Sequence, residues 1–375
     1  MNTNKKWNPN QSGFRHNHTT IDHPLHLHHI TKTGFKKKQT TELVLLDLIK
    51  AFDCVHIPIL INKLIKLNIP TEYTRYIKNY LNNRICTINI NNNNNQQYSP
   101  KCGVPQGSPI SPTLFNIYIN DMPSEKNIHT KLFADDIAIY TTHHNPKTTN
   151  IRIQKHINKI TEHLTNLHFK LNANKTQHIY LQNTKKPYKY PIVINNKKIT
   201  PIPTIKYLGI NLNKQFSADY HLKIQNEKAE LAEHNINKII TKNNGPSANT
   251  TIKLYKTIIR PIIEYGNIFT ATAKTTTMNK ADKTQHKILT KAFRTPRTTP
   301  KKYINTISGT QNIKHRLKYL QHKTLHKHYS LLQHRTHTPI NNIITKSLHD
   351  NSYNIVNPEI TQPPEKYHPT YKWPP

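Results

Sequence analysis

Four acidic residues of this sequence stand among apolar neighbours, where a carboxylate needs a partner. Asp47 interrupts the run VLLDL and Asp53 follows it closely, whereas Asp135 and Asp136 are adjacent within LFADDIAIY. An ionised carboxylate is costly to bury alone, so such groups shift their pKa or bind a cation. Magnesium prefers oxygen ligands, and two such ions held by carboxylates form a phosphoryl-transfer site. The alternative is that Asp135 and Asp136 only form an exposed turn.

A loop rich in glycine and proline, CGVPQGSP at residues 102–109, has the composition of a ligand-facing segment. The sequence has only eight glycines, and Gly103 and Gly107 are two of them. Glycine lets the backbone approach a ligand closely. Gln106 offers amide donors just before an expected helix start, a position that favours phosphate. An ordinary turn is the alternative interpretation.

Apolar periodicity indicates which elements position these residues. Short apolar or alternating runs predict strands at residues 43–48, 84–90, 96–100, 130–133, 137–141, 177–181, 192–194 and 205–212. Helical spacing predicts helices at residues 57–67, 71–81, 111–122, 153–167, 217–240, 251–263 and 279–293. Residues 1–40 show no clean period, and the stretch from residue 339 is expected to be irregular. Strands grouped with helices, without steady alternation, indicate an α+β fold with a helical C-terminal part.

The charge of the chain points to a polyanionic partner. Lys and Arg number 54 against 19 Asp and Glu, for a net charge of +35. Between Asp282 and Asp350 there is no acid but 14 Lys and Arg, which predicts a surface that follows phosphates. Codon bias with a merely basic solvated face is the alternative.

Composition also indicates the cellular compartment in which the protein is expected. The mean hydropathy is −0.74, and no apolar run approaches the ~20 residues of a spanning helix. The first residues, MNTNKKWNPN, contain no apolar signal segment, and three cysteines form no disulfide framework. We therefore expect an intracellular protein, in the nucleus, the cytoplasm or both, with no membrane partner. The histidine groups at residues 26–29 and 143–144 are interpreted as packed or solvated rather than as metal ligands.

Three segments resemble the central motifs of a known enzyme family. LLDLIKAFDCV, GVPQGSPISPTLFNIYINDM and LFADDIAIY occur in this order and are similar to the palm motifs of reverse transcriptases. The fuller pattern resembles the non-LTR, LINE-type, jockey-like retrotransposons. Further similar segments are QSGFRHNHTT, LNANKTQHIYL, IKYLGINLN and LYKTIIRPIIEYGNIF, which resemble the finger, lysine-bearing, primer-grip and thumb segments.

The resemblance implies an RNA-directed DNA polymerase with a right-hand polymerase palm, partial fingers and a helical thumb. The implied parts are a partial fingers segment at residues 1–40, a palm and fingers core at 41–215, a thumb-like helical region at 216–300, and a basic, partly irregular extension at 301–375. The implied partners are an RNA template, a DNA primer and dNTPs, and the oligomeric state stays open. The expected protein is a polymerase core cut from a longer element.

The resemblance also implies roles for single residues around the metals. Asp47, Asp135 and Asp136 match the metal-binding, catalytic carboxylates, which would hold two Mg²⁺ ions, with Mn²⁺ as an alternative. Lys175 matches a proton donor to the pyrophosphate leaving group. Asp53 matches a position that supports the site without binding metal.

A second group of residues is implied to contact the nucleotide. Phe52 matches the aromatic ring that excludes a 2′-hydroxyl. Gln106 and Gly107 match the segment beside the incoming nucleotide and template base, and Arg15 is assigned to the triphosphate. The alternative functions are a catalytically inactive nucleic-acid-binding remnant of such an element and a basic structural protein.

Overall fold

The computed structural model describes residues 7–82, 84–90, 94–184, 187–240 and 245–333. The chain divides into two compact units, residues 1–321 and 322–375. All elements described below lie in the first unit, except that the last helix runs from the first unit into the second.

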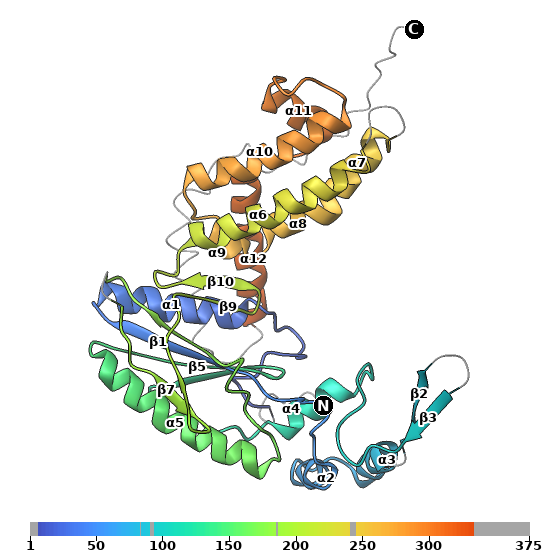
Figure 1. Ribbon diagram of the computed structural model, residues 1–375, viewed down its shortest axis with the longest axis vertical. Helices are drawn as coiled ribbons and strands as arrows, with labels where there is room; N and C mark the ends of the chain where they lie inside the picture. Colours follow the sequence, from blue (N-terminus) through green and yellow to red (C-terminus); the bar gives the residue numbers. More distant parts are fainter. Residues whose placement is uncertain (1–6, 83, 91–93, 185–186, 241–244, 334–375) are drawn as a thin grey trace. The chain divides into compact units, whose positions relative to one another are not determined.

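An antiparallel four-stranded sheet forms the centre of the first unit. Its order is β4–β5–β1–β6, with β1 at Thr40–Leu46, β4 at His129–Phe133, β5 at Asp136–His143 and β6 at Gln177–Leu181. Two helices, α1 (Asp22–Lys36) and α5 (Pro146–Asn166), pack on β1 and β5 and lie on opposite faces of the sheet (Figure 1). Burial on both faces explains why the second half of β1, Leu43–Leu46, is a continuous apolar run. The predicted α+β class is confirmed.

Helix α1 lies in a region for which the sequence predicted no regular element. Its buried face includes Leu25 and Leu27, but also His23 and His26. The Nδ1 atom of His26 lies 2.5 Å from the hydroxyl of Tyr140, so the histidine is packed by a polar contact from the sheet. A hydropathy pattern counts such histidines as polar, which hides the helical period.

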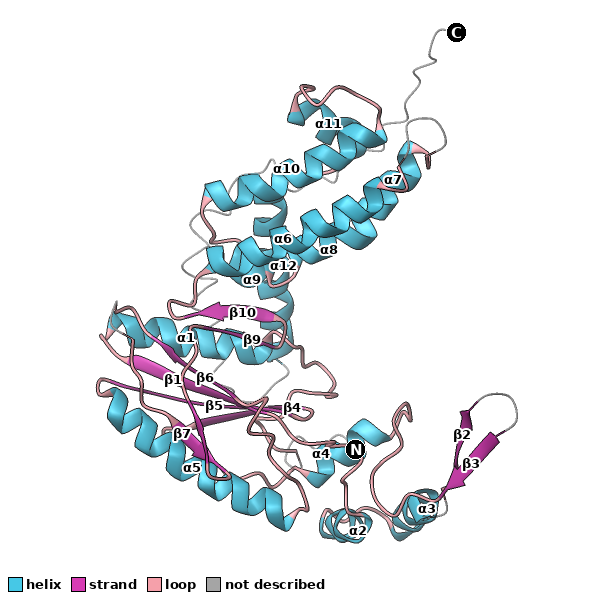
Figure 2. Ribbon diagram, in the orientation of Figure 1, coloured by secondary structure: helices cyan, strands magenta, loops and turns pink. Residues whose placement is uncertain are grey.

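Between β1 and β4 the chain forms α2 (Ile57–Lys66), α3 (Thr71–Asn82), the hairpin β2–β3 (Cys86–Ile90 and Asn94–Tyr98) and α4 (Ser111–Tyr118) (Figure 2). These elements were predicted, although β3 begins two residues earlier than expected. The asparagine run of the predicted turn falls partly on residues 91–93, which lie outside the described residues. Helices α2, α4 and α5 share one apolar core with β1, built around side chains such as Leu60, Phe115 and Ile157.

Two further hairpins follow α5. Strands β7 (Ile192–Ile194) and β8 (Lys197–Ile199) form the first, of which only β7 was predicted. Strands β9 (Thr204–Tyr207) and β10 (Ile210–Asn213) form the second, where the apolar pattern predicted a single strand and the resemblance of IKYLGINLN to a primer-grip segment implied a hairpin. Leu208 and Gly209, both at positive φ, make its two-residue turn.

The C-terminal part is helical, as predicted. Its elements are α6 (Ala218–Asn237), α7 (Ala248–Leu254), the π-helical turn η1 (Tyr255–Ile259), α8 (Arg260–Glu264), α9 (Asn267–Thr270), α10 (Thr275–Ala292), α11 (Lys301–Ser308) and α12 (Ile313–Gln333). The predicted helix 251–263 is interrupted by η1 just before Pro261, which has no N–H for the regular helical bond. One apolar core joins α6 and α10 to Ile304, Ile313 and Leu317. Helical packing therefore continues past residue 300. None of the described helices is long and apolar enough to cross a membrane.

Candidate active site

The three predicted carboxylates converge at one end of the sheet. Leu46 pairs with Ile137 in the antiparallel register of β1 and β5, so Asp47 at the end of β1 lies across from Asp136 at the start of β5. Asp135 stands between β4 and β5, in a turn closed by the pairing of Phe133 with Asp136. Strand pairing thus brings together residues separated by almost ninety positions in the sequence.

The N-terminal segment supports the turn that carries Asp135. The side-chain Oε1 of Gln11 accepts hydrogen bonds from the backbone N–H groups of Gly13 (2.8 Å) and Ala134 (3.3 Å). A Cβ atom on Gly13 would lie 2.4 Å from the Ala134 nitrogen, so the two backbones can approach only because residue 13 is glycine. Asn116 of α4 donates from Nδ2 to the Gly13 carbonyl at 2.7 Å. Gln11, Gly13 and Asn116 are positioning residues to which the sequence assigned no role.

The close approach of the carboxylates changes the protonation of Asp136. Loss of hydration and then the neighbouring charges of Asp135 and Asp47 raise the pKa of the Asp136 carboxyl to about 6. Asp136 is nevertheless an exposed residue. A carboxyl that resists ionisation beside two others is stabilised by either a proton or a cation.

Lys175 lies beside the same carboxylates. Its Nζ is 4.0 Å from Oδ2 of Asp47, and its side chain is 72% exposed. The loop before β6 sets this approach, because the Asn172 N–H donates to the Asp47 carbonyl at 2.8 Å and the Lys175 N–H donates to the Asn172 carbonyl at 3.2 Å. The amine can therefore reach a group bound near Asp47.

The donor set suits a hard divalent cation. The three side chains provide only carboxylate oxygens, which are the ligands that Mg²⁺ prefers. Within the described ranges, no group of three or more His, Cys, Asp or Glu side chains is already gathered in a metal-binding arrangement. The match between these carboxylates and Mg²⁺ therefore rests on the chemistry of the donor oxygens and on the raised pKa of Asp136.

Two backbone hydrogen bonds join the loop 102–109 to the segment after Asp47. The Gly103 N–H donates to the Val55 carbonyl and the Val104 N–H donates to the Phe52 carbonyl, both at 2.8 Å. Gly103 has φ +87°, and a Cβ there would lie 2.8 Å from the carbonyl oxygen of Asp53. The glycine is required by its conformation and by this contact.

The next residues of the loop reach the same neighbourhood. Nε2 of Gln106 donates to Oδ1 of Asp53 at 3.1 Å, a contact that gives Asp53 a role in orienting the amide. Gly107 follows with φ +85°, and no atom lies within 4 Å of where its Cβ would be. Space for a ligand is therefore open beside Gly107.

Phe52 and Arg15 have defined surroundings. The half-buried Phe52 ring stacks on the buried ring of Phe115, with centroids 4.5 Å apart and planes 18° apart. Nη1 of Arg15 donates to the carbonyls of Asn8 and Gln11, both at 3.0 Å. The arginine thereby holds the segment that supports the Asp135 turn.

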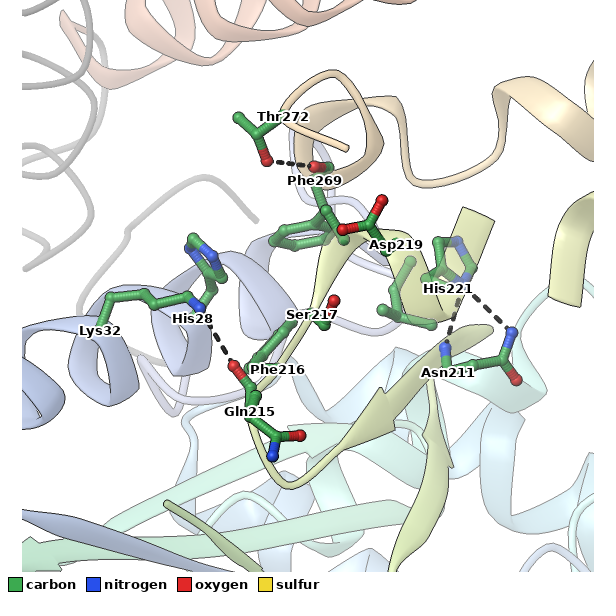
Figure 3. A pocket seen from close by; sticks show the side chains of 12 residues that line it. His28, Lys32, Asn211, Gln215, Phe216, Ser217, Asp219, His221, Phe269 and Thr272 are labelled. Atoms are coloured by element: carbon green, nitrogen blue, oxygen red, sulfur yellow. Dashed lines mark hydrogen bonds between the residues drawn. The ribbon is translucent and has the colours of Figure 1, made fainter. Parts of the chain in front are cut away.

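A separate pocket of about 300 Å³ lies between α1, the start of β10 with the loop that follows this strand, the start of α6, and α9 (Figure 3). The rings of His28 and Phe216 meet there at 4.9 Å between centroids, and Lys32 donates to the Gln215 carbonyl at 3.0 Å. The structure describes every predicted site residue, and none of them lines this pocket. This pocket is distinct from the carboxylate site.

Several known proteins are similar to this chain. The jockey mobile-element RNA-directed DNA polymerases of Drosophila melanogaster and Drosophila funebris are 25% and 26% identical, over 68% and 76% of this chain. The probable RNA-directed DNA polymerase of transposon BS from Drosophila melanogaster is 26% identical over 68% of this chain. The chain spans 29%, 32% and 29% of these relatives, in that order, so less than a third of each.

One solved structure of Candida albicans telomerase, in complex with a fragment of telomeric RNA, is 12% identical with a TM-score of 0.49. It covers 83% of this chain, and the match takes in 56% of the telomerase chain.

The resemblance found in the motifs is confirmed by the jockey and BS relatives. Residues 1–212 match the family described as reverse transcriptase, RNA-dependent DNA polymerase. This match includes every predicted site residue and more than half of the 375 residues. The chain therefore belongs to the reverse transcriptase family.

Proposed function

We propose that this chain is the catalytic core of a non-LTR retrotransposon reverse transcriptase, which copies an RNA template by extending a DNA primer with dNTPs. The observation that carries the proposal is the meeting of Asp47, Asp135 and Asp136, where loss of hydration and then the charges of Asp135 and Asp47 raise the pKa of Asp136 to about 6. Membership of the family supports the reaction class. The net charge of +35 suits a primer–template as partner.

Asp47, Asp135 and Asp136 would hold two divalent cations, with Mg²⁺ as the expected ion and Mn²⁺ as an alternative. When bound, such ions stabilise charge on the attacking and leaving oxygens of phosphoryl transfer. The protein contributes the fixed placement of the carboxylates, through the β1–β5 register and the contacts of Gln11 and Gly13 with the Asp135 turn.

Lys175 is proposed to give a proton to the pyrophosphate leaving group. An exposed ammonium 4.0 Å from Asp47 is close enough to the carboxylates to serve a group that leaves beside them. Proton donation by a positioned side chain contributes ~10²–10⁴-fold in typical enzymes.

The nucleotide would lie between the segment after β1 and the loop 102–109. Phe52 would press on its sugar, while Gln106 and the open side of Gly107 would face the base pair that forms. Arg15 is proposed to act on the triphosphate side. Its bonds to the carbonyls of Asn8 and Gln11 support a positioning role as well.

The parts of the polymerase are proposed from the same arrangement. The sheet with α5 would be the palm. The segment 1–40, whose helix α1 packs on that sheet, and α2–α3 with the β2–β3 hairpin would supply finger contacts, and the helices from α6 onward would form the thumb. The basic extension of residues 301–375 would begin within the thumb packing, because Ile304 and Ile313 belong to the same core.

The test is primer extension on poly(rA)/oligo(dT), run with Mg²⁺, with Mn²⁺ and with a chelator. Metal-dependent addition of dTTP is expected. A binding assay on the same substrate accompanies it, because tight binding without any extension would favour the inactive remnant, and the absence of both would contradict the proposal.

A further inference from the structure

Helix α3 carries tyrosines on one face that the proposed chemistry does not use. Tyr73, Tyr76 and Tyr80 are spaced three and four residues apart, so they lie along one side of the helix. Tyr73 and Tyr76 are 63% and 65% exposed. Thr74 and Leu81, the buried residues of α3, occupy the neighbouring stripe. Two large rings in water on adjacent turns indicate a binding surface.

Two of the three rings have an ordered arrangement. The Tyr76 and Tyr80 rings are nearly parallel, with planes 7° apart and centroids 6.3 Å apart. At 1.5 Å of rise per residue, the stripe from Tyr73 to Tyr80 is about 10 Å long. That length corresponds to roughly three nucleotides at the ~3.4 Å spacing of stacked bases.

A direct contact connects this stripe to the proposed nucleotide site. The Tyr80 hydroxyl donates to Oγ of Ser108 at 3.0 Å, and Ser108 follows Gly107 in the loop 102–109. A strand whose next base lies at Gln106 and Gly107 would therefore have its following bases beside the tyrosines. In Figure 1, α3 lies between α2 and the β2–β3 hairpin.

The charge of the whole chain, +35, favours a polyanion. On α3 itself Arg75 and Lys78 are exposed on the side of the helix away from the tyrosines, and Glu72, one turn before Tyr76, is the only acid of that helix. Exposed aromatic rings on a strongly basic protein are features by which proteins bind single-stranded nucleic acid, because every base has a face that stacks.

We propose that Tyr73 and Tyr76 of α3 form a stacking platform for unpaired bases of a single-stranded RNA, the part of the template that has not yet been copied. The identification of that RNA as template rests on the proposed function, whereas the stacking itself does not. Tyr80 anchors the platform to the loop through Ser108.

The test is binding of a fluorescent single-stranded RNA of about twelve nucleotides, without primer or metal. The variant Y73L/Y76L should bind roughly fivefold or more weakly, because each stacked base is worth ~1–3 kcal/mol. The slope of log Kd against log salt should not change, because no charge is removed. The variant Y73F/Y76F keeps both rings and should bind like the parent.

The matched control replaces an exposed tyrosine outside the basic C-terminal stretch, in Y190L, whose parent residue is 40% exposed. This control should leave binding unchanged. A 2-aminopurine base within the RNA should be quenched by the parent and by Y73F/Y76F, and less by Y73L/Y76L. Circular dichroism should show all four proteins equally folded.

Equal affinity and equal quenching for the parent and Y73L/Y76L would overturn the platform, whether or not the parent extends primers. Conversely, a parent that binds RNA through the tyrosines but extends no primer would contradict the proposed function alone.

Discussion

Gln106 donates a 3.1 Å hydrogen bond from Nε2 to Oδ1 of Asp53, which links the glycine-rich loop to the segment that follows Asp47, the first of the proposed catalytic carboxylates. Both residues are exposed, so this bond orients the amide rather than stabilising the fold. Asp53 is therefore a positioning residue for Gln106.

The link predicts that D53A should lower kcat/KM for dTTP by roughly twofold to tenfold, because a net hydrogen bond is worth ~0.5–1.5 kcal/mol. D53N keeps an acceptor oxygen at the same place and should recover most of the loss. Steady-state primer extension measures both variants, and their melting temperatures should match that of the parent. Equal losses in D53A and D53N would contradict the orienting role.

Phe52 is expected to discriminate against ribonucleotides. A 2′-hydroxyl pressed against the ring costs ~1–3 kcal/mol of overpacking, which is roughly tenfold to a few hundredfold in rate. F52V should lower the ratio of kcat/KM for dTTP over UTP on one template. The ring also stacks on Phe115, so F52V should cost ~1–3 kcal/mol of stability. A ratio that does not fall, with that stability loss, would leave Phe52 as a packing residue only.

Much of this fold could be predicted because its signals are local. The strand before Asp47, the hairpin around Asp135 and the helix after the loop follow from apolar runs and turn residues of neighbouring positions. The contacts that support the site are not local. Gln11 reaches Ala134 across 123 positions and Asn116 reaches Gly13 across 103, so no spacing in the sequence could indicate them.

Helix α1 could not be predicted because its buried face includes histidines, which a hydropathy pattern counts as polar. Buried histidines also make the free energy of unfolding depend on pH. Burial, and then the nearby charge of Lys131, lower the pKa of His23 and of His129, each to about 4. The unfolded chain takes up these protons below about pH 6.5, while the folded chain does not. The free energy of unfolding should therefore fall by a few kcal/mol as the pH falls from 6.5 to 4.

Urea unfolding at a series of pH values measures this effect. H23Q removes one of the groups and should flatten the dependence, even if the variant is less stable at pH 7. H16Q replaces an exposed histidine and serves as the matched control. A stability that does not change between pH 6.5 and 4 would show that these histidines are not buried as neutral groups.

Salt dependence tests the basic C-terminal surface. Deleting the basic stretch would remove core residues such as Ile288 and Leu289, so neutralising exposed lysines is the better change. The variant K283Q/K301Q/K302Q/K318Q removes four exposed charges. Each of these that contacts a phosphate should reduce the slope of log K against log salt on a primer–template by ~0.9. An unchanged slope would place the binding surface elsewhere.

The raised pKa of Asp136 predicts a competition between protons and metal. As the pH falls through about 6, a growing fraction of this carboxyl is neutral and binds cations poorly. The Mg²⁺ concentration that gives half-maximal primer extension should therefore rise as the pH is lowered from 7.5 to 5.5. A half-maximal concentration that is independent of pH would contradict the assignment of Asp136 as a ligand.

The most direct test of the central claim separates chemistry from binding at Asp136. Primer extension and binding are measured on one poly(rA)/oligo(dT) substrate at saturating Mg²⁺, for the parent, D135N and D136N. Each asparagine removes a metal-holding charge, so nucleotide addition should be lost, while Kd for the substrate should stay close to that of the parent because Lys and Arg carry the binding. If D136N extends the primer at the parental rate, the carboxylates at the end of the sheet are not the catalytic site.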